Sequence, residues 1–170
     1  MFKRIRLRIQ DMKTISKLIA GADEQAHMSG EDEPGAEHFL LSALRLPDGT
    51  AKRVFERIGA NPEQFRNAIK KQYSDALSSI GIDQKVLDED PEPVKSSRRL
   101  HNAKPSGRTL MKELYALKQK DKDRPLLGAH VISVIATMKH GVAARSLRTM
   151  NINDDKLSLA VKNELDSYCY

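Results

Sequence analysis

A stretch of about 33 residues occurs twice in this sequence. Residues 38–46 read HFLLSALRL and residues 130–138 read HVISVIATM, so the copies lie 130 − 38 = 92 residues apart. Extended without a gap to residues 70 and 162, this offset gives seven identities in 33 positions, where chance gives roughly two. The repeat constrains the fold strongly, because it predicts two copies of one supersecondary unit. The identical pairs are His38/His130, Gly49/Gly141, Ala51/Ala143, Arg53/Arg145, Asn61/Asn153, Ala68/Ala160 and Lys70/Lys162.

Apolar residues spaced three and four apart predict helices in both copies. Short turns rich in Gly, Pro, Asn and Asp separate these segments. We therefore predict an all-α fold, in which eight helices form two pseudo-symmetric four-helix repeats. The expected helices are 12–29, 36–46, 50–58 and 61–80 in the first half, and 105–122, 128–138, 142–150 and 153–165 in the second.

Two of these helices begin with recognisable capping residues. Asn61 can cap the helix that follows it, Pro62 suits the first helical position, and Gln64 can complete a capping box. Asn153 is expected to cap the last helix, whose first turn is acidic and therefore favourable to the helix dipole.

The segments outside the repeats differ in composition. Residues 1–10 alternate basic and apolar side chains with a period of two, which predicts a basic extended arm. Residues 81–104 contain the acidic, proline-bearing run DEDPEP, which predicts an exposed linker. The expected organisation is therefore an arm (1–10), a first repeat (11–80), a linker (81–104) and a second repeat (105–170).

Composition narrows the function classes. The net charge is +6, and basic residues cluster at the N-terminus and between Lys95 and Arg124. A nucleic-acid or polyanion binder is therefore the alternative function, although solvated helix surface explains the same charges and nucleic acid is not the favoured partner. No apolar run is long enough to span a membrane, and no secretory signal opens the chain. The single cysteine, Cys169, excludes an intrachain disulfide, which fits a cytoplasmic protein.

Motifs for catalysis or for binding cofactors and metals are absent. The sequence has no phosphate-binding G-x-x-x-x-G-K-[ST] loop, no C-x-x-C, no H-E-x-x-H and no G-x-S-x-G. Glu37 and His38 form an acid–histidine pair, but the second copy reads Ala129-His130, and adjacent helical side chains point about 100° apart. We therefore predict no catalytic residue, cofactor or metal. His38 and His130 are expected to be structural, with each ring bonded to the loop before its helix.

Three segments carry a resemblance to a known family. They are EHFLLSAL at residues 37–44, GTAKRVFERIG at 49–59 and GVAARSLRTMN at 141–151. They resemble the amino-terminal domain of the Clp ATPases of the ClpA, ClpB and ClpC type, a double four-helix repeat. The resemblance covers about residues 11–80 and 106–165.

The resemblance implies a function. In the family this domain precedes AAA+ ATPase modules, whereas this chain ends at Tyr170, so we expect a free-standing, non-enzymatic binding module. Its expected partners are Clp ATPase or protease subunits, adaptor proteins or degradation substrates, in an accessory or decoy role.

The resemblance also implies a binding residue. The glutamate of this motif is associated in the ClpC branch with arginine-phosphorylated substrates, which makes Glu37, together with the preceding Ala36, the candidate ligand-binding residues. Ala129 lacks the carboxylate needed to hold a guanidinium. Ala36 and Gly128 stand where the family usually has threonine.

Overall fold

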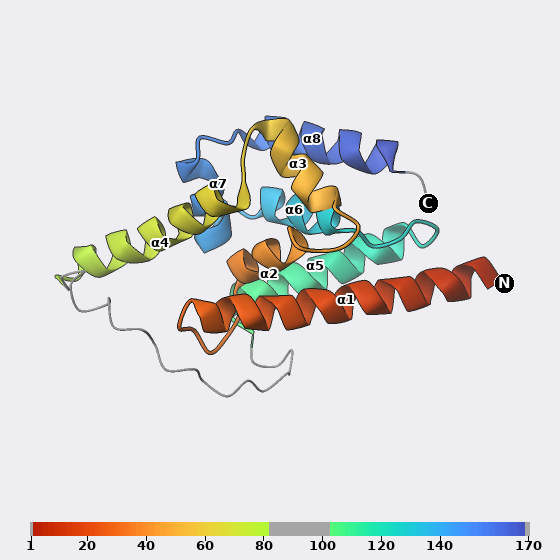
Figure 1. The fold of residues 1–170 in the computed structure, drawn as a ribbon, viewed down its shortest axis with the longest axis horizontal. Coiled ribbons are helices and arrows are strands. Elements are labelled where there is room, and N and C mark those ends of the chain that lie inside the picture. Colours follow the sequence, from red (N-terminus) through yellow and green to blue (C-terminus); the bar gives the residue numbers. More distant parts are fainter. Residues whose placement is uncertain (1, 82–102, 169–170) are drawn as a thin grey trace.

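The computed structural model describes residues 2–81 and 103–168, and within these ranges the chain forms eight helices and no strand (Figure 1). The predicted all-α class is thus confirmed. None of the eight helices is both long and apolar enough to span a bilayer. Most of the predicted linker lies outside the described residues, as does Cys169. The helices are α1 (Phe2–Met28), α2 (Ala36–Ala43), α3 (Thr50–Ile58), α4 (Pro62–Ser79), α5 (Pro105–Lys120), α6 (Gly128–Thr137), α7 (Val142–Thr149) and α8 (Asp154–Ser167).

Helix α1 begins much earlier than the sequence pattern suggests. Residues 2–10 are its first turns, so the predicted extended arm is wrong. Leu7 precedes Asp11 by four residues and Leu18 by eleven, and this helical spacing places all three on the buried side. Ile5 and Ile9, which created the alternating pattern, are about half exposed. Leu7 is therefore the one apolar residue of the alternating run that is buried, and a helix can bury a single residue as well as a strand can.

The two halves exchange helices across a common core. Helix α1 packs on α2, and α5 packs on α6, as expected for neighbours in each half. However, α3 packs against α8 and α4 packs against α7, so the last helix of each half lies on the third helix of the other (Figure 1). Helices α2 and α6 also contact each other. The halves therefore share one hydrophobic core.

Glycines permit the closest approaches between the halves. A Cβ on Gly107 of α5 would lie 2.7 Å from the Pro34 carbonyl oxygen and 3.0 Å from the Phe39 ring. A Cβ on Gly128, at the start of α6, would lie 3.0 Å from the Ala43 carbonyl oxygen. A side chain at Gly107 would force a shift of the backbone, and one at Gly128 would require its neighbours to give by a few tenths of an ångström.

The predicted caps are present. Asn61 Oδ1 accepts a hydrogen bond from the Gln64 amide at 2.9 Å, and Gln64 Oε1 accepts one from the Asn61 amide at 3.1 Å. Asn153 Oδ1 accepts one from the Asp155 amide at 2.8 Å. These bonds satisfy amides at the helix starts that have no intrahelical partner, and they fix where α4 and α8 begin.

Candidate functional site

The two repeated histidines make equivalent hydrogen bonds. His38 Nδ1 accepts from the Gly35 amide at 3.0 Å, and His130 Nδ1 accepts from the Leu127 amide at 3.0 Å. Each ring is thereby tied to the loop before its helix, as predicted. Burial lowers the pKa of His38 to about 4 and lowers the pKa of His130 as well. Both rings are therefore neutral at physiological pH, with the His38 proton on Nε2.

Glu37, the predicted ligand-binding residue, is an interior carboxylate. Its side chain is 1% exposed. Tyr73 of α4 donates a hydrogen bond to Oε1 at 3.1 Å, while Oε2 accepts no hydrogen bond from the described residues. Burial raises the pKa of Glu37, and burial together with the Glu37 charge raises the pKa of Tyr73. The carboxylate thus retains one oxygen that could accept a further donor.

Lys104 supplies a cation to this buried carboxylate. Its Nζ donates to Glu31 Oε2, donates to Tyr73 Oη at 3.2 Å, and lies 3.8 Å from Glu37 Oε1. It also lies 5.4 Å from the centre of the Tyr73 ring, within cation–π range. Burial lowers the pKa of Lys104. We name Glu31, Glu37, Tyr73 and Lys104 the carboxylate–lysine cluster.

The same region holds three side chains that could in principle bind a metal. Glu31, Glu37 and His38 have ligand atoms within 4.8 Å of one another. However, the lone pair on His38 Nδ1 is engaged by the Gly35 amide, so Nε2 of the neutral ring carries the proton and cannot be a ligand. The Lys104 ammonium already lies close to both carboxylates. The geometry therefore fits a cluster that holds an ammonium group better than a metal centre.

The start of α6 is built differently from the start of α2. Ala129 replaces the glutamate, and its amide donates to Thr50 Oγ1 at 2.9 Å. The Gly128 amide donates to the Asp48 carboxylate at 3.3 Å. In the first half, by contrast, the Ala36 amide donates to Ser106 Oγ at 3.2 Å. Each helix start is thus completed by side chains from the opposite half.

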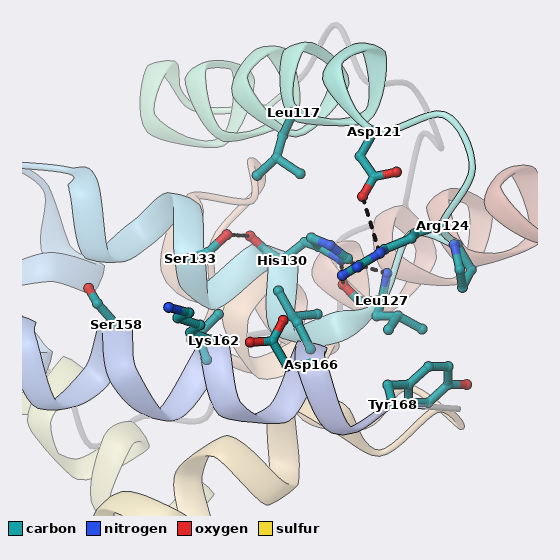
Figure 2. Close-up of a pocket in the computed structure, with 13 residues that line it drawn as sticks. Leu117, Asp121, Arg124, Leu127, His130, Ser133, Ser158, Lys162, Asp166 and Tyr168 are labelled. Atoms are coloured by element: carbon teal, nitrogen blue, oxygen red, sulfur yellow. Dashed lines mark hydrogen bonds and ion pairs between the residues drawn. The ribbon is translucent and has the colours of Figure 1, made fainter. Parts of the chain in front are cut away.

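A cleft of about 380 Å³ opens beside His130, between α5, α6 and α8 (Figure 2). Apolar side chains form part of its lining, and Lys162 and Asp166 of α8 lie across from His130 and Ser133 of α6. Arg124 at its edge pairs with Asp121 at 3.6 Å. No sequence motif indicated this cleft, because its residues come from three separate helices, the loop between α5 and α6 and the residue that follows α8. The lining residues are Leu117, Asp121, Arg124, Pro125, Leu127, His130, Ser133, Ser158, Val161, Lys162, Leu165, Asp166 and Tyr168.

Comparisons with known proteins agree with this fold. The family of the Clp repeat (R) N-terminal domain matches residues 13–102. The chaperone protein ClpC1, chloroplastic, of Oryza sativa is 34% identical over 58 residues, and the chaperone protein ClpC, chloroplastic, of Pisum sativum is 34% identical over 59 residues. These matches cover 34% and 35% of this chain, but only 6% of each relative. The crystal structure of the N-terminal domain of the chaperone ClpD from Arabidopsis thaliana matches with a TM-score of 0.55 and 18% identity, covering 93% of both chains.

Proposed function

Because the chain belongs to the family of Clp repeat N-terminal domains, we propose that it is a non-enzymatic protein-binding module of the Clp chaperone–protease system. It would bind degradation substrates, adaptor proteins or subunits of the Clp machine, in an accessory or decoy role. The double-repeat fold carries this proposal, since it accounts for nearly all of the described residues. The cytoplasm is the expected compartment, although the relatives named above are chloroplastic proteins.

The experiment for this proposal is affinity capture from native lysate. The full chain should enrich Clp subunits, adaptors or degradation substrates when compared with an unrelated helical protein of similar charge. Capture of none of these three classes would contradict the proposal.

A side chain of the bound partner would enter the cleft beside His130. Its lining combines apolar, charged and hydroxyl side chains, which is the usual composition of a ligand pocket. Ser158 lies on the exposed side of α8 and lines the cleft. A Ser158→Trp variant should therefore fill the cleft, leave the core intact and reduce partner capture. The matched control is Leu159→Trp, at an exposed neighbouring position that does not line the cleft. Equal capture by both variants would exclude the cleft.

Glu37 supports a narrower proposal, the binding of arginine-phosphorylated proteins. A guanidinium can bind a carboxylate through two charge-assisted hydrogen bonds, and Glu37 Oε2 has no hydrogen-bond partner among the described residues. Lys104 lies against the same carboxylate, so an arginine ligand has to move the lysine aside. The cost of moving Lys104 reduces the apparent affinity in the wild type.

Calorimetric titration with phosphoarginine tests this narrower proposal. We expect weak binding by the wild type, no binding by Glu37→Gln, and binding about tenfold tighter by Lys104→Met because the competing ammonium is gone. Lys112→Met, which removes an exposed lysine from α5, should bind like the wild type. Equal heats for the wild type and Glu37→Gln would rule out Glu37 as the site, without bearing on the cleft beside His130.

A further inference from the structure

We propose that the amino-terminal turns of α1, together with the neighbouring face of α5, form a docking surface for an acidic amphipathic helix of a partner protein. The groove on this surface shares no lining residue with the cleft beside His130 and contains no member of the carboxylate–lysine cluster. Residues 2–12 precede the region matched by the family, residues 13–102.

An apolar stripe runs along this part of α1. Ile5, Ile9 and Met12 are spaced four and three residues apart, so their side chains lie on one helix face. They are 51%, 49% and 70% exposed. Three residues further, Ile15 lines an apolar groove of about 500 Å³ against α5. The stripe therefore continues from exposed helix surface into a groove.

Helix α5 forms the other wall of this groove. Met111, Leu114 and Tyr115 line it, and Tyr115 is 67% exposed. Lys118 of α5 also lines the groove, and its Nζ forms an ion pair with Asp11 of α1 at 3.0 Å. An exposed apolar stripe on α1 that leads into an apolar groove against α5 offers the geometry by which an amphipathic helix docks through residues at i, i+3, i+4 and i+7.

The charge around this surface identifies the kind of helix that fits. Between residues 2 and 20 and along α5, ten side chains are basic and only Asp11 and Glu113 are acidic. Arg6 and Arg8 form no ion pair within the described ranges. A second copy docking through the same face would bring like charges together, which is unfavourable. Acidic residues flanking the apolar stripe of a partner helix would instead be complementary to these basic side chains of α1 and α5.

Binding of synthetic peptides to the full chain tests this inference. The probe is a helical peptide with leucine at alternating spacings of three and four and glutamate beside each leucine. Its control carries lysine in place of glutamate. We expect the acidic peptide to bind with an affinity that falls as salt rises, and the lysine peptide not to bind. Binding of both peptides, or of neither, would overturn the proposal.

Substitutions on the stripe locate the site. The double variant Ile9→Gln/Met12→Gln should bind the acidic peptide at least about tenfold more weakly, because it removes apolar contact area. Both positions are exposed, so the fold should be unaffected. Leu159→Gln, at a 59% exposed leucine on α8, is the matched control and should bind normally. Equal binding by the double variant and the control would overturn the proposal. Binding of phosphatidylglycerol vesicles or duplex DNA in place of the acidic peptide would also overturn it.

Discussion

Acidification should destabilise this protein through His38. The ring is fully buried and uncharged, and its pKa is lowered from 6.5 to about 4 by burial. Between these two values the unfolded chain binds a proton that the folded chain does not, so the free energy of unfolding decreases as the pH falls. A difference of about two and a half pH units, at about 1.4 kcal/mol per unit, corresponds to roughly 3 kcal/mol. This is a large part of the stability of an ordinary domain.

The variant His38→Asn isolates this effect. An asparagine Oδ1 can accept the hydrogen bond that His38 Nδ1 accepts from the Gly35 amide at 3.0 Å, but it cannot titrate. The raised pKa of Glu37 acts in the opposite direction, since that carboxyl favours folding as the pH falls. Glu37 is present in both proteins. Subtracting the variant's pH dependence from that of the wild type therefore leaves mainly the His38 contribution.

Urea denaturation followed by circular dichroism, at several pH values between about 6.5 and about 4, measures the effect. The wild type should lose roughly 3 kcal/mol more than His38→Asn across this range, whatever their difference at neutral pH. His140→Asn, at an exposed histidine, should retain the wild-type slope. If the free energy of unfolding changes with pH in the same way for the wild type and His38→Asn, the reasoning is refuted.

Three further substitutions test particular contacts by the same denaturation assay. Asn61→Ala removes the α4 cap and should cost about 1 kcal/mol; an unchanged midpoint would argue against the cap. Gly107→Ala places a Cβ 2.7 Å from the Pro34 carbonyl oxygen and should cost about 1–3 kcal/mol, whereas a neutral effect would show that α5 can shift. Glu164→Gln weakens the hydrogen bond that Arg53 Nε donates at 2.5 Å, and it should lower the free energy of unfolding by about 1–3 kcal/mol. A double-mutant cycle with Arg53→Met should show that the two costs are coupled. Additive costs would contradict a direct interaction between the two side chains.

Local patterns predicted the helices well, for reasons visible in the structure. The spacing of apolar residues records which helix face is buried, and the Asn61–Gln64 cap depends only on neighbouring residues. The prediction of an extended arm at the amino terminus was wrong because a period of two over six residues is also compatible with a helix that buries only Leu7. The exchange of helices between the halves could not be predicted from local patterns, because it depends on packing between distant segments such as α3 and α8.

The candidate site was predicted only in part, for a related reason. The repeat identified His38, Glu37 and their second-half equivalents, because they belong to one short motif. It could not show that Lys104 lies against Glu37, since 67 residues separate them in the sequence. Nor could it show that Asp48 and Thr50 bond to the start of α6. Whether a repeated motif forms a repeated site depends on what the opposite half places beside it.

Restoring the glutamate in the second half tests that conclusion. Ala129 is fully buried, and the 92-residue offset aligns Leu165, which has no hydroxyl group, with Tyr73. In Ala129→Glu the new carboxylate would therefore lack the hydroxyl donor that Tyr73 provides to Glu37. The substituted residue is also the one whose backbone amide donates a hydrogen bond to Thr50 Oγ1. An uncompensated buried charge should cost about 3 kcal/mol or more, whereas Ala129→Ser should cost much less. If Ala129→Glu unfolds at the wild-type urea concentration, the surroundings of the two helix starts do not decide where a glutamate is tolerated.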